Sequence, residues 1–256
     1  GGGRRVRGLV AALDDRGGWL NPDIAHWFAD YARAVYRALD DRVLHWTTLN
    51  EPWVVADGGY LFGSLAPGHR NLFEAPLASH HLLRAHAEAV RAYRADGKHR
   101  IGLVVNLEPK VAASEAPEDL AAARRADAYM NRQYLDPVFF GRHPEELREI
   151  FGEAWPEFPQ REVEGLREPI DHLGINYYTR GVTRYDPEQW PLRASSVPQP
   201  GHVYTETGWE VFPSAFSDVL CWVRDRYGEI PLYVTENGAA FADPPTAAQG
   251  RVPDPQ

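Results

Sequence analysis

Apolar and polar residues alternate along the chain in two patterns, one typical of helices and one typical of buried strands. After Asn21-Pro22, apolar residues recur every three to four positions up to Leu39, which predicts a helix of about five turns. A run rich in β-branched and aromatic residues follows at 43–49 and stops before Pro52, as expected of a buried strand. Helix-like and strand-like patterns continue to alternate along the chain. They predict further strands at 101–105, 172–178 and 231–235, and helices at about 77–94 and 213–227.

The remaining stretches indicate a single domain over residues 1–256. Helical stretches interrupted by prolines are expected between residues 118 and 167. The Pro-rich segment 179–212 is predicted to be irregular, and so are residues 1–8 and 239–256.

Continuous apolar strands separated by helices predict an α/β fold with a parallel sheet that is covered on both faces. An open doubly wound sheet is one alternative, but it usually carries a Gly-rich turn after its first strand, and the glycines at 1–3 follow no strand. A (β/α)₈ TIM barrel instead places polar and acidic residues at the C-terminal ends of several strands. Such residues occur at 50–51, 176–178 and 236–237, but only four strands can be counted. The expectation is therefore a partial (β/α)₈ barrel.

Charge and composition narrow the class of protein. The chain has 27 basic and 36 acidic residues, a net charge of −9, which argues against nucleic acid as a partner. No apolar stretch approaches the roughly 20 residues needed to span a bilayer, so no membrane association and a cytoplasmic location are expected. The one cysteine, Cys221, lies in an apolar run and is predicted to be a small core residue. His80, His81 and His86 lack metal-ligand spacing, so no metal site is predicted.

Aromatic residues are abundant, with 8 Trp and 12 Tyr. Their faces can stack on sugar rings, but they also fill cores, so the excess favours carbohydrate only weakly. Trp190 and Trp209, in the irregular segment, are candidates either for outer sugar subsites or for loop packing.

Glu51 and Glu236 each follow a predicted strand and each lie beside an asparagine. If the two strands belong to one barrel, both carboxylates point into one crevice. A retaining glycosidase needs such a pair roughly 5–5.5 Å apart, one to attack the anomeric carbon and one to protonate the leaving oxygen. The charge of the nucleophile would keep its neighbour protonated near neutral pH. The alternative for either glutamate is a capping or salt-bridging role.

Several segments of this sequence resemble glycoside hydrolase family 1, the β-glucosidase and β-galactosidase family. Residues 48–52 (TLNEP) and 234–238 (VTENG) look like its two signature segments. The similarity runs from about residue 9 to 238. It also includes 15–21 (DRGGWLN), 59–60 with 66–68, 174–178 (GINYY) and 208–210 (GWE).

The resemblance implies hydrolysis of β-glycosides or oligosaccharides with retention of configuration, without a cofactor. Glu236 would be the nucleophile and Glu51 the acid/base catalyst. Because Glu51 is intact, the sequence resembles the O-glycosidases of the family rather than its thioglucosidases. The remaining implied roles are sugar binding by Asn50 and Asn176, orientation of Glu236 by Tyr178, and an aglycone platform at Trp53. Asn176 and Tyr178 could instead be plain barrel-end residues, and Trp53 could be packing.

The resemblance also has gaps. Residues 6–10 (VRGLV) stand where family members carry a His-Trp-Asp-Leu-Pro segment. Strands one, two and eight of the family barrel are not found, so the chain is expected to hold about strands four to seven of eight. Two functions remain open, an active β-glycosidase and an inactive or weakly sugar-binding remnant. Unpaired barrel edges also predict possible self-association.

Overall fold

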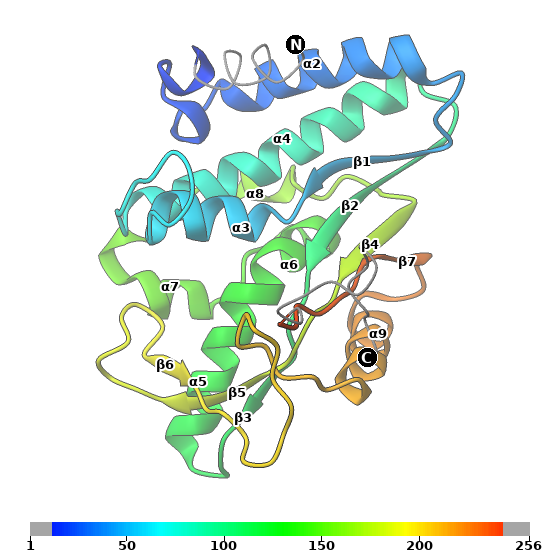
Figure 1. Ribbon diagram of the computed structural model, residues 1–256. Helices are drawn as coiled ribbons and strands as arrows, with labels where there is room; N and C mark the ends of the chain where they lie inside the picture. The colour runs from blue at the N-terminus through cyan, green and yellow to red at the C-terminus, as the bar shows by residue number, and fades with distance from the viewer. Residues whose placement is uncertain (1–11, 243–256) are drawn as a thin grey trace.

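The centre of the structure is a four-stranded parallel sheet. A computed structural model describes residues 12–242 of the chain (Figure 1). The strands lie in the order β1-β2-β4-β7, and every neighbouring pair is parallel. Helices connect successive strands, which confirms the predicted alternation. The strands are β1 (His45–Asn50), β2 (Arg100–Asn106), β4 (His172–Asn176) and β7 (Leu232–Glu236).

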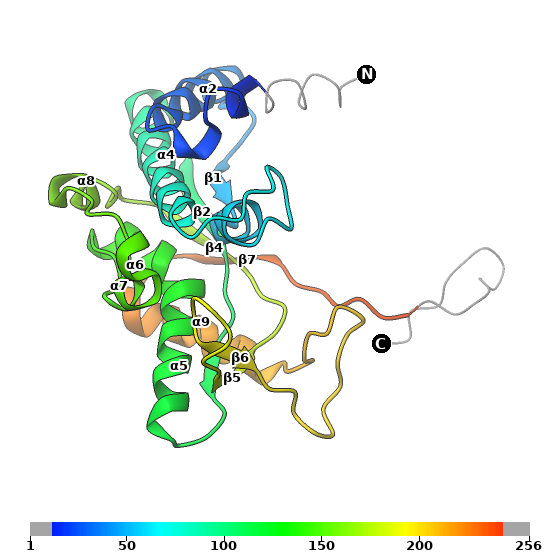
Figure 2. The ribbon, with the colours of Figure 1, turned by 90° about the vertical axis from the view of Figure 1, so that its left-hand side faces the viewer.

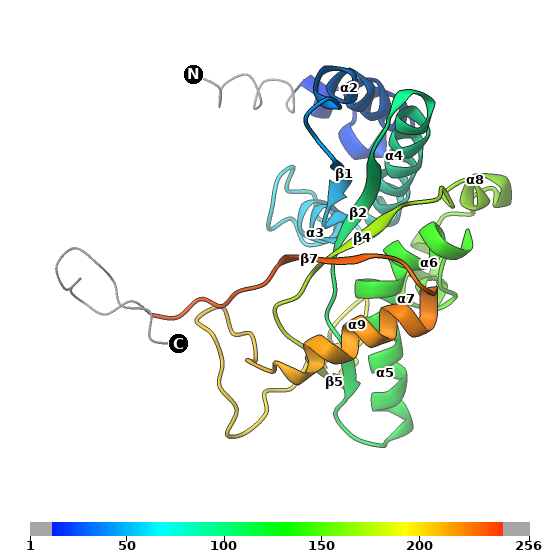
Figure 3. The same ribbon diagram turned by 90° about the vertical axis from the view of Figure 1, so that its right-hand side faces the viewer.

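Helices cover one face of this sheet, with α4 (Glu74–Asp96) and α6 (Gln133–Phe140) on the same side of the strands (Figures 2 and 3). Helices α2, α4 and α9 were predicted individually, although α2 begins two residues after the expected proline start, and α5 to α8 lie where proline-interrupted helical stretches were expected. The helices are α2 (Ile24–Leu39), α3 (Pro52–Ala56), α4 (Glu74–Asp96), α5 (Pro117–Asp127), α6 (Gln133–Phe140), α7 (Glu146–Phe151), α8 (Gln160–Glu164) and α9 (Ser214–Tyr227). Short 3₁₀ turns (Gly18–Leu20, Gly152–Ala154) and π-helical turns (Asp57–Leu61, Ala128–Arg132) join them.

The core lies between the sheet and these helices because alternate strand residues point to the helix side. Leu103 and Val105 of β2 and Leu173 and Ile175 of β4 are buried in one cluster with residues of α6 and α9. Each such side chain contributes about 2 kcal/mol through burial. The opposite face of the strands is closely packed near Gly102, where a Cβ atom would lie 2.3 Å from the carbonyl oxygen of β4's first residue. A side chain at this glycine would push the two strands apart.

The segment 179–212, predicted to be irregular, contributes two strands to a second, three-stranded sheet. β3 (Lys110–Ala112) pairs in parallel with β5 (Gly181–Tyr185), which pairs antiparallel with β6 (Ala194–Ser196). These strands have three to five residues, too few for a periodic pattern to stand out among prolines. Residues 239–242 have no regular structure, as predicted, whereas 1–8 and 243–256 lie outside the described residues.

The prediction that Cys221 is a core residue is wrong, because its side chain is exposed. It lies on α9, whose buried residues include Val219 and Val223. Positions 219 and 223 are one turn apart and share a helix face, whereas 221 lies half a turn away on the solvent side.

The strands β1 and β7 form the two edges of the main sheet, each with one paired neighbour among residues 12–242. Large apolar side chains are exposed at or beside these edges, with Leu44 at 59% and Val234 at 49% exposure. Within the same residues, no helix has the length and apolar character to cross a bilayer. A cytoplasmic location stays a prediction.

Candidate active site

Three strands of the main sheet end in the residues that the sequence singled out. β1 ends at Asn50 with Glu51 next, β4 ends at Asn176, and β7 ends at Glu236. Asn176 and Glu236 are register partners across the β4–β7 pair. Because the strands are parallel, all of these residues lie together at one end of the sheet, where the strands have their C-terminal ends.

Glu51 lies at a sharp turn of the backbone between β1 and α3. Its φ and ψ are 48° and 62°, a left-handed conformation that costs a non-glycine residue about 1 kcal/mol or more. The Glu51 amide donates to the Val104 carbonyl at 3.0 Å and holds the turn, and Pro52 begins α3 directly after it. Backbone strain that persists in this way is commonly found at functional sites.

Asn176 links the ends of β1, β4 and β7 through its amide side chain. It is fully buried, and its Nδ2 donates to Glu51 Oε1 at 2.7 Å and to Asn50 Oδ1 at 3.1 Å. Its Oδ1 accepts a hydrogen bond from Thr235 at 2.5 Å. These partners fix the direction of the amide, so Glu51 is held in one orientation.

Glu236 is exposed and is held by Tyr178, whose hydroxyl donates a hydrogen bond to its carboxylate. This hydrogen bond, together with desolvation, raises the pKa of Tyr178 to about 12. The phenol therefore stays protonated and remains a donor at neutral pH. The amide of Asn237 donates to the Tyr177 carbonyl at 2.7 Å and fixes the end of β7 against β4.

The charge of Glu236 acts on the neighbouring carboxyl group of Glu51. Burial raises the pKa of Glu51, the hydrogen bond from Asn176 opposes the rise, and the nearby charge of Glu236 adds to it. Glu51 thus keeps its proton to a higher pH than an ordinary glutamate does. A proton-donating carboxyl beside a second carboxylate can protonate a leaving group while the other attacks.

Comparison with known proteins identifies the family. The sequence model described as glycosyl hydrolase family 1 matches residues 8–255. The chain belongs to glycosyl hydrolase family 1. It is 41% identical over 239 residues to a 1,4-beta-D-glucan glucohydrolase of Thermotoga neapolitana, covering 92% of this chain and 55% of the relative. It is also 41% identical over 250 residues to beta-glucosidase A of Thermotoga maritima, covering 96% of this chain and 55% of that protein.

The fold agrees with this membership. A solved structure of a family 1 β-glucosidase from Thermotoga maritima superposes with a TM-score of 0.89 and 40% identity, over 95% of this chain and 54% of that one. The family 1 neighbours are (β/α)₈ barrels, so the four-stranded parallel sheet is part of such a barrel, as predicted. The chain spans about half the length of the relatives it matches.

Trp53, the expected aglycone platform, lies on α3 directly after the Glu51 turn. Its half-buried ring packs against two core clusters and meets Tyr129 edge-on, with 6.2 Å between the ring centroids. Packing therefore explains much of its position, and a platform role stays a prediction. Trp209, by contrast, is 39% exposed and lies beside Tyr178, with 4.9 Å between their ring centroids. Through Tyr178, which binds Glu236, Trp209 lies close to the candidate site.

A salt-bridge cluster beside Tyr178 was not predicted. Glu210, only 4% exposed, accepts hydrogen bonds from Arg180 Nε at 2.9 Å and Nη2 at 3.0 Å, and from His202. Glu210 lies in the segment 208–210 (GWE) that resembles the family. No sequence pattern indicates that its partners Arg180 and His202 lie 30 and 8 residues away. This cluster anchors the segment that carries Trp209.

The three histidines of α4 are buried, consistent with structural roles. Between residues 12 and 242 there is no group of three or more His, Cys, Asp or Glu side chains arranged to hold a metal ion.

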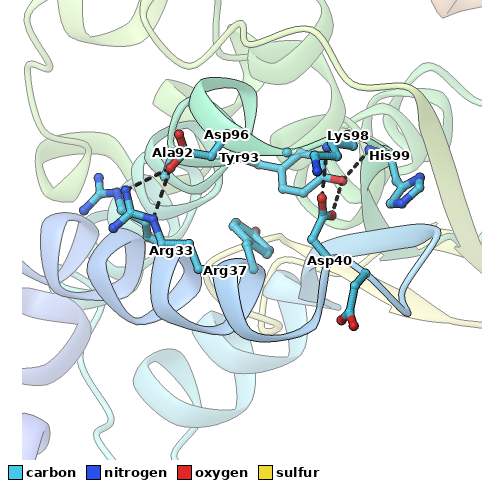
Figure 4. Close-up of a pocket in the computed structure, with 11 residues that line it drawn as sticks. Arg33, Arg37, Asp40, Ala92, Tyr93, Asp96, Lys98 and His99 are labelled. Atoms are coloured by element: carbon cyan, nitrogen blue, oxygen red, sulfur yellow. Dashed lines mark hydrogen bonds and ion pairs between the residues drawn. The ribbon is translucent and has the colours of Figure 1, made fainter.

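A pocket between the C-terminal ends of α2 and α4 lies at the opposite end of the strands, where β1 and β2 begin (Figure 4). The carboxylates of Asp40 and Asp96 in this lining are paired with neighbouring polar groups. Asp40 accepts from the Tyr93 hydroxyl at 2.8 Å, and Arg37 pairs with Asp96 at 2.8 Å. These contacts join the two helices and mark a structural junction rather than a second catalytic site.

Proposed function

We propose that this chain carries the catalytic pair of a retaining β-glucosidase-like enzyme, with Glu236 as the nucleophile and Glu51 as the acid/base. The supporting observation is that Asn176 binds Glu51, and Tyr178 binds Glu236, at the C-terminal ends of β1, β4 and β7. The names of the relatives support terminal β-linked glucose as the substrate.

The reaction would proceed in two displacements. In the first, Glu236 attacks the anomeric carbon while Glu51 gives its proton to the glycosidic oxygen, and the carbon–oxygen bond to the aglycone breaks. The resulting ester removes the negative charge of Glu236, which lowers the proton affinity of Glu51. Glu51 then takes a proton from water, the hydroxide oxygen attacks the anomeric carbon, and Glu236 is released.

We also propose roles for the polar residues around the pair. Asn50 is exposed and can contact a sugar hydroxyl. Asn176 donates its amide hydrogens to Asn50 and Glu51, so a direct contact with the sugar would replace one of these bonds. Tyr178 would keep Glu236 in line for attack. Trp53 would face the aglycone beyond Glu51.

The test is the substitution Glu236→Ala, assayed with an aryl β-glucoside. Turnover should be abolished, because no group remains to form the covalent intermediate, and added azide should restore product formation by attacking in its place. The matched control is Glu229→Ala, an exposed glutamate on the same approach to β7, which should retain wild-type turnover. Turnover unchanged in Glu236→Ala would overturn the assignment.

A second candidate is a chain that binds sugar without hydrolysing it. The observation in its favour is the exposure of Glu236 on an edge strand, where water reaches a carboxylate that an enzyme would enclose. Calorimetric binding of deoxynojirimycin without turnover of any aryl glucoside would support this candidate. Measured turnover would eliminate it.

We further propose that the chain self-associates through the edges of its main sheet. The unpaired backbone groups along the outer sides of β1 and β7, together with the exposed apolar residues there, are the supporting features.

A further inference from the structure

The strand that leads to Glu51 contains a bulge. Thr47 pairs with Gly102 and Asn50 pairs with Val104, so two residues of β1, Thr48 and Leu49, lie opposite a single residue of β2. Bulges bend a strand and redirect the side chains that follow. Here the bulge ends one residue before Glu51, whose backbone is itself left-handed.

A hydrogen bond from the helix behind the sheet holds this bulge. Helix α4 packs against β1 (Figure 1). Thr48 Oγ1 lies 2.6 Å from Nδ1 of His86 on that helix and 3.4 Å from the Gly102 carbonyl oxygen. The threonine hydroxyl thus connects the bulged strand to both the helix and the neighbouring strand.

His86 has no evident purpose other than this contact. It is fully buried, and burial lowers its pKa to about 4, so the ring is neutral near pH 7. Its second ring nitrogen, Nε2, is buried without a hydrogen-bond partner in the part of the chain that the structure describes. An apolar side chain would fill this space without leaving a polar atom unpaired. The bond to Thr48 is therefore the contact that accounts for an imidazole at this position.

We propose that Thr48 and His86 form a positioning pair that fixes the β1 bulge and so aims Glu51 at Asn176 and at the leaving oxygen of the substrate. The inference rests on the proposed role of Glu51 as acid/base. Neither residue touches substrate; both act through the backbone that carries Glu51. When the bulge loosens, the hydrogen bond from Asn176 to Glu51 weakens. Since that bond favours the ionised carboxylate, its loss raises the pKa of Glu51.

The test uses the full chain with ¹³C-labelled glutamate carboxyl groups and follows the titration of Glu51 by NMR, assigned with Glu51→Gln. Thr48→Val removes the hydroxyl at nearly constant volume and should raise the pKa of Glu51, whereas Thr48→Ser keeps the hydroxyl and should leave it unchanged. In an Asn176→Ala background, Thr48→Val should cause no further rise. A folded Thr48→Val protein with an unchanged Glu51 titration would overturn the proposal.

A second pair of variants covers the case in which Thr48→Val does not fold. His86→Leu removes the partner of Thr48, and His86→Asn retains a polar atom near the position of Nδ1. The pKa of Glu51 should rise in the first and return toward the wild-type value in the second. Equal titrations in both variants would overturn the pairing.

Kinetics separate positioning from a general loss of structure. With Thr48→Val, kcat/KM should fall about tenfold for a 4-nitrophenyl glucoside, which needs protonation, and less than about twofold for a 2,4-dinitrophenyl glucoside, which needs little. Equal losses for both substrates would mean a merely structural role. Glu51→Ala tests the proposed function separately: if it leaves turnover unchanged, the acid/base assignment fails, while the titration still decides whether Thr48 positions Glu51.

Discussion

Glu210→Gln should destabilise the segment that carries Trp209, because it removes one charge from a buried ion pair. The Glu210 carboxylate receives two hydrogen bonds from Arg180 and one from His202. The Arg180 guanidinium also lies over the Phe212 ring, 3.4 Å from its centroid. After the substitution, the Arg180 charge keeps its place in a largely buried site but loses its counter-charge.

The expected cost is about 3 kcal/mol. Removing one partner of a buried pair typically costs about 3–5 kcal/mol, and the retained amide oxygen of glutamine places this case at the low end. For a chain of this length, each kcal/mol lowers Tm by about 2 °C, so a decrease of about 6 °C is expected. The hydrogen bonds from Arg180 hold the pKa of Glu210 below its ordinary value. The stabilisation is therefore present at neutral pH and is lost as pH falls through that lowered pKa.

The assay is urea unfolding, followed by fluorescence, at pH 7 and at pH 3. Glu206→Gln is the matched control, since Glu206 is exposed on the same segment, and it should change the free energy of unfolding by less than about 0.5 kcal/mol. The difference between wild type and Glu210→Gln should shrink at pH 3. A Glu210→Gln protein within about 0.5 kcal/mol of wild type at pH 7 would show that the buried ion pair does not stabilise the segment.

Burial raises the pKa of Asp57 to about 6, so the folded state binds its proton more tightly than the unfolded chain does; stability should fall by roughly 3 kcal/mol as pH rises from about 4 to 7. Asp57→Asn should remove this decline in urea titrations, and an unchanged pH slope would contradict it. Tyr178→Phe should lower kcat/KM for an aryl glucoside about 100-fold, whereas a loss under twofold would exclude its role in holding Glu236. Light scattering should give a mass above the 28.8 kDa of one chain, and a compact monomer would contradict association through the sheet edges.

The main sheet and its longest helices could be predicted because their signals are local. β2 and β4 are continuous apolar runs, and α2, α4 and α9 repeat apolar residues at helical spacing. The second sheet could not be predicted, because β5 and β6 are short and because β5 pairs with β3, about 70 residues earlier, while β6 pairs only with β5. The burial of Cys221 was predicted wrongly for a related reason. When an apolar run is helical, the run alone does not show which of its residues face solvent.

The site shows the same division between local and distant signals. Glu51, Asn176 and Glu236 could be predicted from their places at strand ends, since parallel strands bring such residues to one edge. The contacts that hold them could not. Asn176 and Glu51 are 125 positions apart, and the Thr48–His86 hydrogen bond joins a strand to a helix 38 residues later. Such pairs become visible only when the chain is folded.

Covalent bonding of Glu236 to the sugar is best tested by mass spectrometry after incubation with a 2-deoxy-2-fluoroglucoside that carries a dinitrophenyl leaving group. The fluorine destabilises the positively charged transition states, and the activated leaving group lets the first displacement outpace the second, so the intermediate accumulates. We expect one added fluoroglucosyl mass per chain, located on the peptide that contains Glu236 and absent from Glu236→Ala. No added mass, or a label on another residue, would contradict it.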